Sequence, residues 1–146
     1  MNLTSAFPHL REEDRALLAS MGSRIAVRSD QPVLHEGEKT EALYVTIRGM
    51  FRVTRSYDAE HSLEFAGPLG PGDLFGEMSF LDDRPSSATL VADGDSEVLK
   101  LEGEAVRKLI AENDAFAAGF YKSVAAVLSR RLRQTSNRVL QPPMMS

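Results

Sequence analysis

Residues 43–55 read Leu-Tyr-Val-Thr-Ile-Arg-Gly-Met-Phe-Arg-Val-Thr-Arg, and their pattern decides the fold class. Apolar side chains occupy every second position from 43 to 47 and again at 51 and 53, with more polar residues between them. A period of two is typical of a β-strand with one face buried and one face exposed. Because Gly49 separates the two runs, we expect one strand before this residue and one after it.

The sequence on both sides of this stretch continues the same theme. Further short strands fit residues 24–28, 32–35, 62–66, 88–92 and 97–101. Clusters of Gly, Pro, Asp and Glu predict turns at residues 30–32, 36–38, 70–73 and 93–95. Many short strands at this spacing indicate a sandwich, a barrel or a jelly roll. We therefore expect residues 23–101 to form a β-roll.

Helical patterns flank the strands. Apolar residues at helical spacing predict an N-terminal helical segment over residues 1–22, with Gly22 as its stop, and helices over residues 102–140. The second of these helices begins at Asn113-Asp114, and Pro142-Pro143 prevents it from continuing. Residues 141–146 are expected to form a tail. One face of the long helix carries an apolar seam, which packs either against the domain itself or against a second copy. The seam consists of Tyr121, Val124, Leu128, Leu132, Thr135 and Val139.

Composition narrows the class of protein. The 146 residues suit one domain, and the absence of cysteine excludes disulfides, thiol catalysis and cysteine-ligated metal. We find no apolar run long enough to span a membrane and no secretory signal, so we expect a cytoplasmic protein without a membrane partner. The net charge of −4 argues against bulk nucleic-acid binding. Residues 115–146 nevertheless hold five basic side chains and no acid, which is a solvated helix face or a contact with an anionic partner.

Residues 70–89 interrupt the strand pattern. Phe75-Gly76-Glu77 followed by Met78 and three further residues predicts a single helical turn within the sheet, and Gly76 would let a ligand approach the backbone closely. Unpaired N–H groups at such a turn suit an anion such as a phosphate. Glu77 fits sugar hydroxyls better than a phosphate. The plain alternative is a surface turn that is capped by this glutamate.

These motifs resemble those of the cyclic nucleotide-binding domain family, which includes the sensor domain of the bacterial catabolite activator protein, protein kinase A regulatory subunits and cyclic nucleotide-gated channels. The phosphate-binding cassette of that family has the form Phe-Gly-Glu, a short apolar helix and then Pro-Arg-Ser/Ala-Ala-Thr, and residues 75–89 fit it without a gap. Residues 35–38, 43–45, 48–49 and 70–73 fit further family motifs. The resemblance covers about residues 3–140 and implies an eight-stranded jelly roll with flanking helices.

The resemblance also implies a ligand site for cAMP or cGMP. Glu77 would bind the ribose 2′-hydroxyl, while the backbone amides of Gly76 and Glu77, with Ser87, would face the cyclic phosphate. Thr135 and Ser136 lie where the catabolite activator protein uses a Thr-Ser pair to read adenine, one residue from each subunit. This favours cAMP and a homodimer through the C-terminal helix. The expected ligand-binding residues are Phe75, Gly76, Glu77, Met78, Arg84, Ser86, Ser87, Ala88, Thr89, Thr135 and Ser136.

One departure from the family pattern lies in the cassette. The family places an arginine directly after the cassette proline, paired with the phosphate, and this chain has Ser86 there. Arg84, two residues earlier, starts on the other side of Pro85, so we expect it to replace the missing cation only in part. A charge-assisted hydrogen bond contributes about 1.5–3 kcal/mol, so its loss would weaken binding roughly ten- to 150-fold.

Two function classes follow, and two others are disfavoured. The first is a regulatory binding module for cyclic nucleotides that signals through its C-terminal helix to an unidentified effector. The second is a degenerate domain that binds no nucleotide and acts in oligomerisation or partner binding. A metal-dependent enzyme on a similar roll would need converging ligands, and the three histidines, His9, His35 and His61, are well separated. Only six residues follow the long helix, so we expect no DNA recognition by this chain.

Overall fold

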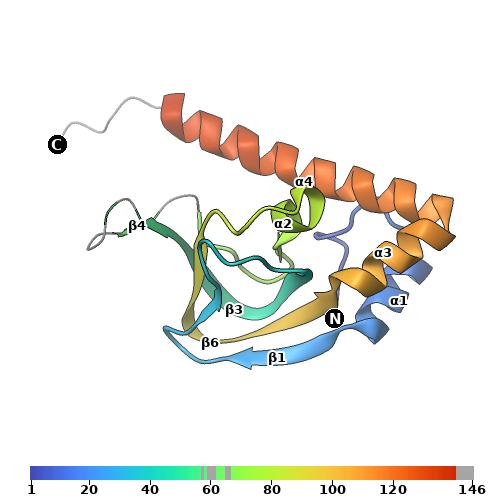
Figure 1. Cartoon of the computed structure of the whole chain (residues 1–146), viewed down its shortest axis with the longest axis horizontal. Helices are drawn as coiled ribbons and strands as arrows, with labels where there is room; N and C mark the ends of the chain where they lie inside the picture. Colours follow the sequence, from blue (N-terminus) through green and yellow to red (C-terminus); the bar gives the residue numbers. More distant parts are fainter. Residues whose placement is uncertain (57, 59–61, 65–66, 141–146) are drawn as a thin grey trace.

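The computed structural model describes residues 1–56, 58, 62–64 and 67–140 of the chain. The strands form one rolled layer with α1 and α3 at one end, while α4 runs along its whole length (Figure 1). The elements in chain order are α1 (Glu12–Met21), β1 (Ser23–Val27), β2 (Pro32–Leu34), β3 (Ala42–Ser56), β4 (Ser62–Glu64), β5 (Leu74–Phe75), α2 (Glu77–Asp82), β6 (Thr89–Glu102), α3 (Gly103–Glu112) and α4 (Asp114–Leu140).

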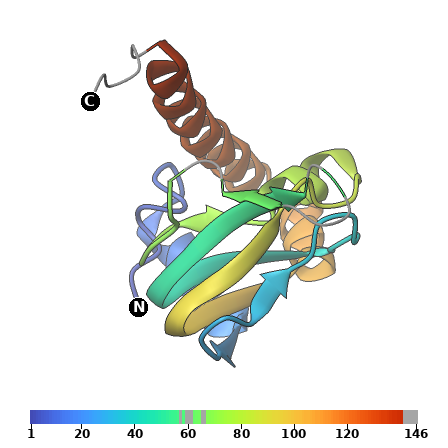
Figure 2. The same ribbon diagram turned by 90° about the vertical axis from the view of Figure 1, so that its left-hand side faces the viewer.

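The sheet is antiparallel throughout and is built on two long strands. Its order is β1-β6-β3-β4, with β2 also paired to β6 and β5 paired to β3. Figure 2 shows β3 and β6 curling together around the interior of the roll. The expected β-roll over residues 23–101 is therefore observed in the described residues, although residues 65 and 66 of one expected strand lie outside them.

Six strands occur in the described residues, in place of the eight expected, because β3 and β6 do not break where the turn residues lie. The register between β3 and β6 shifts on both sides of Arg48. Regular pairing resumes where Met50 of β3 lies opposite Asp93 of β6. The turn expected at residues 93–95 was wrong: Gly94 has a φ of +85° but lies within β6, at a bulge. Counting the halves of each long strand separately gives eight segments.

Two apolar clusters lie on the two sides of β3. One fills the inside of the roll around Tyr44, Phe51 and Phe75, and the other joins the outside of the roll to the helices around Phe7 and Phe120. Residues 42–46 are consequently buried on both faces, whereas we expected one face in solvent. From Phe51 to Thr54 the predicted alternation of buried and half-buried residues is confirmed.

The N-terminal segment is only partly helical. Residues 12–21 form α1, but the first ten residues form turns, so the prediction of helix from residue 1 was wrong. Pro8 restricts the residue before it and removes a donor, which disfavours helix at this point. Arg15 instead donates hydrogen bonds to the backbone oxygens of Phe7 and Leu10 and holds these turns against the helix. Gly22 ends α1 as predicted.

The long helix α4 begins as predicted, but its apolar seam is divided. The Asn113 side chain accepts a hydrogen bond from the N–H of Phe116 at 3.0 Å, which caps the helix. Val124 is 1% exposed and packs in the outer cluster together with the half-buried Leu128. Leu132 is 69% exposed, so the seam faces the body over one part and solvent over the next. The side chain of Val139 lies outside the described set.

Candidate functional site

The cassette begins where β5 ends, and aromatic packing holds its first residue. Phe75 is 2% exposed, and its ring stacks on Tyr44 with centroids 5.1 Å apart. Gly76 then turns the chain into α2 with a φ of +84°, and a Cβ at this position would lie 2.8 Å from the oxygen of Ala42. The predicted single helical turn is confirmed, and glycine is required there for both conformation and space.

Glu77, the expected ribose ligand, is buried and ion-paired. Its side chain is 6% exposed, and its Oε1 lies 2.7 Å from Nη1 of Arg131, which comes from α4. The second terminal nitrogen of Arg131 donates to the oxygen of Leu74. Burial raises the pKa of the Glu77 carboxyl above its ordinary value, while Arg131 and the backbone N–H of Glu77 act in the opposite direction. The cassette and the C-terminal helix are therefore joined through one buried carboxylate.

The second half of the cassette is held by a neighbouring turn. The N–H of Ser86 donates to the oxygen of Glu38 at 2.9 Å, and the N–H of Gly37 donates to the oxygen of Ser86 at 2.8 Å. The Ser86 hydroxyl donates to the oxygen of Ala88 at 2.7 Å. The hydroxyl oxygen of Thr89 accepts a hydrogen bond from the N–H of Glu36 at 3.0 Å. Ser86 and Thr89 thus use their hydroxyls to shape the loop.

The other expected cassette residues divide between the core and the surface. Ala88 is buried in the inner cluster beside Phe75. Met78, Arg84 and Ser87 are exposed. The N–H of Arg84 donates to Asp82, and its guanidinium has no hydrogen-bond or ion-pair partner among the described residues. Three other cations contact the cassette: Arg131 at Glu77, Lys39 at Asp83 at 3.0 Å, and Arg107 at the oxygen of Phe80 at 3.2 Å. Arg84 remains in solvent.

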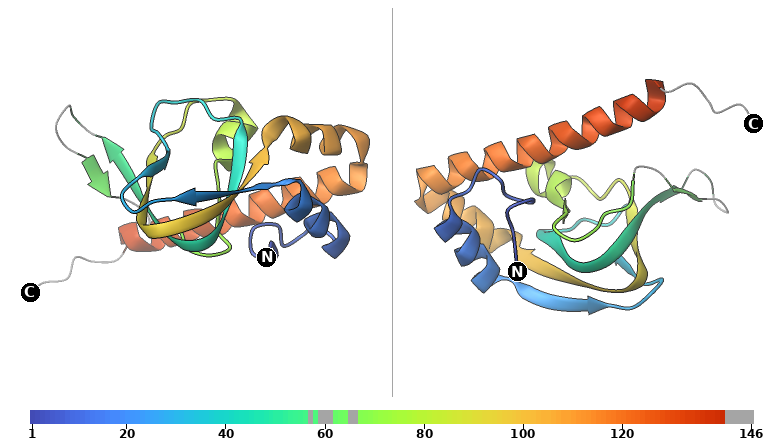
Figure 3. Two further views of the ribbon diagram at one scale, coloured as in Figure 1. Left: turned by 90° about the horizontal axis from the view of Figure 1, so that it is seen from below. Right: turned by 180° about the vertical axis from the view of Figure 1, so that it is seen from behind.

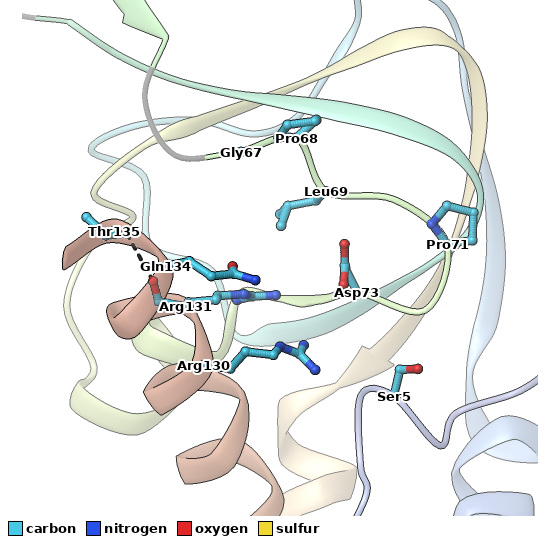
Figure 4. A pocket seen from close by; sticks show the side chains of 10 residues that line it. All are labelled: Ser5, Gly67, Pro68, Leu69, Pro71, Asp73, Arg130, Arg131, Gln134 and Thr135. Carbon is cyan, nitrogen blue, oxygen red and sulfur yellow. Dashed lines mark hydrogen bonds between the residues drawn. The ribbon is translucent and has the colours of Figure 1, made fainter. Parts of the chain in front are cut away.

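The two expected base-reading residues lie on the exposed part of α4. The Thr135 hydroxyl donates to the oxygen of Arg131 one turn earlier, at 3.0 Å, and Ser136 is exposed. Thr135 is one of the residues that line the cavity between α4 and the body of the domain (Figure 4).

A cavity of about 340 Å³ lies between α4 and the loop that precedes β5. Figure 4 shows Arg130, Arg131 and Gln134 projecting from the helix toward the loop and Asp73. Figure 3 shows the N-terminal segment passing beneath α4 on the same side, and Ser5 comes from it. The wall opposite the helix is formed by Gly67, Pro68, Leu69 and Pro71. Arg131 contacts Glu77 and also lines this cavity, so this one side chain connects the cavity to the cassette.

Arg131 is the residue that sequence reasoning missed. It lies 54 positions after Glu77, and no local spacing connects two residues on a helical turn and a distant helix. The available signal was indirect: a carboxylate inside an apolar motif needs a buried partner, and the long helix holds a cluster of arginines.

Two other classes of site were searched among the described residues. No group of three or more metal-ligating side chains occurs in that part of the chain, and His61 lies outside it. Similarly, no helix in the described ranges is long and apolar enough to cross a membrane.

The fold and site define a class: a rolled sheet with a short helical cassette, closed by a long helix that contacts it. Residues 24–113 match the family model described as the cyclic nucleotide-binding domain, and the chain belongs to this family. It is 36% identical over 130 residues to the cyclic AMP receptor protein of Thermus thermophilus, covering 88% of this chain and 57% of that protein. It is 28% identical to cyclic GMP-binding protein C of Dictyostelium discoideum, over 89% of this chain and 5% of that protein.

Solved structures agree with this assignment. The catabolite activator protein of Thermus thermophilus superposes with a TM-score of 0.76 at 33% identity, covering 92% of this chain and 61% of that one. A cyclic nucleotide-binding domain from Methylobacillus flagellatus superposes with a TM-score of 0.84 at 21% identity, over 99% and 85%, which supports the fold alone. The chain thus spans little more than half of the receptor protein that it matches and most of the isolated domain.

Proposed function

We propose that this chain is a regulatory binding module for cAMP or cGMP, without catalysis of its own, which signals through α4. The observation that carries the proposal is the ion pair between Glu77 of the cassette and Arg131 of α4. A ligand that uses Glu77 necessarily changes the surroundings of a residue on the signalling helix. Membership of the cyclic nucleotide-binding family supports the ligand class.

The ribose end of the ligand would act on this pair. A sugar hydroxyl that donates to the Glu77 carboxylate takes over part of the hydrogen bonding that Arg131 now supplies. Arg131 can then keep the shared carboxylate or release it, and α4 occupies a different position in each case. The ligand shifts the helix only by the difference between its affinities for these two positions.

The phosphate end would rest on weaker contacts than in relatives with a cassette arginine. Ser86 shapes its own loop, and Arg84 lies in solvent without a partner among the described residues. The groups left for the phosphate are the backbone amides of Gly76 and Glu77 and the exposed Ser87 hydroxyl. We therefore expect affinity for cyclic nucleotides to be lower than a cassette arginine would allow.

A second copy of the chain is part of the proposal. The residues of α4 that stay exposed or half-buried repeat at steps of three and four, which is the spacing of a two-stranded coiled-coil seam. This seam consists of Ala118, Tyr121, Ala125, Leu128, Leu132 and Thr135. It contains the exposed Ala125 in place of the buried Val124, so it differs at this position from the apolar seam predicted from the sequence. Pairing along it would bring Thr135 and Ser136 of two chains toward the ligand sites.

The alternative is a degenerate domain that binds no nucleotide and acts in oligomerisation or partner binding. Ser86 supports it, because its hydroxyl and backbone are fully engaged in the loop and offer nothing to a phosphate. In that case the Glu77–Arg131 pair would be a permanent structural link rather than a switch.

Calorimetric titration with cAMP and cGMP separates the two, using the parent and Ser86→Arg side by side. Micromolar or tighter binding by the parent supports the sensor and makes the cassette arginine dispensable. Binding by Ser86→Arg alone supports the degenerate domain, with an intact pocket that lacks its phosphate contact. Absence of binding by both contradicts a cyclic nucleotide ligand.

A further inference from the structure

The cavity between α4 and the loop before β5 holds an excess of positive charge. Arg130 and Arg131 both project into it from α4 (Figure 4). The guanidinium of Arg130 has no hydrogen-bond or ion-pair partner among the described residues. Of the described residues that line the cavity, only Asp73 is acidic, and its carboxylate already accepts a hydrogen bond from the N–H of Gly70 at 2.7 Å. Two cations therefore share this space with a single carboxylate.

The cavity is separate from the cassette in its construction. None of its lining residues belongs to residues 75–89, because its walls come from the N-terminal segment, the loop over residues 67–73 and α4. Its volume of about 340 Å³ lies at the lower end of the range of small-molecule sites. Pro68 and Leu69 supply apolar surface opposite the helix (Figure 4). A ligand of this cavity would thus be small, anionic at one end and apolar at the other.

We infer that the cavity binds a small phosphate monoester, with the phosphate between Arg130 and Arg131 and the organic group against Pro68 and Leu69. The planar guanidinium group binds phosphate through paired hydrogen bonds. A phosphate monoester carries about two negative charges near pH 7 and has three acceptor oxygens, so one such group can neutralise both arginines. A carboxylate carries one charge and neutralises only one of them.

An occupant of the cavity would act on the cassette through Arg131. Nη1 of this residue lies 2.7 Å from Oε1 of the buried Glu77. A phosphate beside Arg131 shares its guanidinium with Glu77, and the carboxylate then accepts hydrogen bonds from a sugar more readily, because its own cation is partly withdrawn. The phosphate monoester and the cyclic nucleotide would therefore raise each other's affinity by the same factor. This coupling rests on the proposed function, whereas the anion site does not.

The anion site is tested first, without any cyclic nucleotide. Calorimetric titrations at constant ionic strength compare phenyl phosphate, inorganic phosphate and benzoate. We expect phenyl phosphate to bind the parent more tightly than the other two, because it alone combines the doubly charged group with an apolar ring. Arg130→Met should weaken its binding about five- to 50-fold.

The matched control is Arg133→Met, which removes the same charge from a neighbouring exposed residue that does not line the cavity. It should change the affinity for phenyl phosphate by less than about twofold, since solvent screens a charge at that distance. Arg130 and Arg133 are both exposed, so the midpoint of thermal unfolding should stay at that of the parent and confirm folding.

The coupling is tested by titrating cAMP with and without saturating phenyl phosphate. We expect phenyl phosphate to raise the affinity of the parent for cAMP at least about fivefold, and to have no such effect in Arg130→Met. The same titrations in a Ser86→Arg background keep the effect measurable if the parent binds cAMP weakly. An unchanged affinity for cAMP would overturn the coupling through Arg131.

The remaining outcomes separate the anion site from the proposed function. Absence of phenyl phosphate binding by the parent, equally tight binding of benzoate, or parent-like binding by Arg130→Met overturns the anion site. Mutual exclusion of phenyl phosphate and cAMP overturns it as well, because it would place the phosphate at the cassette. If neither the parent nor Ser86→Arg binds cAMP, but phenyl phosphate still binds through Arg130, the proposed function fails and the anion site is supported.

Discussion

At the scale of single residues, the Glu77 carboxyl makes the folded protein sensitive to pH. Its pKa is raised because burial penalises the charged form, so the folded protein holds this proton more tightly than the unfolded chain does. The stabilising contribution of the group is therefore fully present below the ordinary pKa of glutamate and is lost as pH rises through the raised folded value. Glu77→Gln carries no ionisable group and lacks this dependence.

We expect the free energy of unfolding of the parent to fall, relative to Glu77→Gln, as pH rises across that window. Urea unfolding of both proteins from about pH 4 to about pH 8 measures the difference. A parent that gains stability over the variant with rising pH would show that attraction to Arg131 outweighs burial.

A second residue-scale prediction concerns Gly76, where conformation and space act together. Gly76→Ala places a Cβ at a φ of +84° and 2.8 Å from a backbone oxygen, and we expect it to cost about 2–4 kcal/mol. Gly94→Ala is the matched control, because its φ is +85° but nothing lies within 4 Å of the added atom. It should cost only about 1 kcal/mol. Equal losses in thermal unfolding would mean that the Ala42 oxygen moves aside freely.

At the scale of elements, Arg131 joins α4 to α2, and its removal leaves a buried carboxylate without its partner. We expect Arg131→Met to cost about 2–4 kcal/mol, somewhat below a fully buried pair because a quarter of the Arg131 side chain is exposed. Glu77→Gln added to that variant should recover part of the loss, which a double-mutant cycle measures directly. Arg130→Met, one residue earlier and without a partner in the described part of the chain, should change stability by less than about 0.5 kcal/mol.

The elements also show which patterns in a sequence determine structure. Asn113 and Gly76 affect only residues close to them in the chain: Asn113 caps the first turn of α4, and Gly76 turns the chain into α2. The start of α4 and the position of α2 were therefore predictable from the sequence. Gly94 has the positive φ of a turn residue, but its strand continues because the paired strand β3 bends at the same place. Gly49 of β3 also has a positive φ, and it lies so close to β6 that a Cβ on it would be 2.1 Å from the Ser96 hydroxyl. A bulge formed by two strands together cannot be read from either alone.

The same reasoning holds for the candidate site. Glu77 and its cassette could be identified from a contiguous motif, whereas Arg131 and Gln134 could not, because the packing of α4 on the roll decides which of its residues face inward. Val124 and Ala125 are equally acceptable on an apolar face by sequence, and only the body of the domain separates them into buried and exposed.

At the scale of the whole molecule, the exposed seam of α4 predicts a dimer. Leu132, the fifth of the six seam residues, is 69% exposed, and burying one such side chain from each copy contributes about 3 kcal/mol or more in total. We therefore expect Leu132→Glu to raise the dimer dissociation constant at least roughly 100-fold in sedimentation equilibrium. Arg133→Glu introduces the same side chain one position outside the seam and a larger change of charge, so it should leave the dimer intact. A parent that sediments as a monomer at all concentrations, with and without cAMP, would contradict the dimer. Equal effects of Leu132→Glu and Arg133→Glu would show that the association depends on charge rather than on the seam.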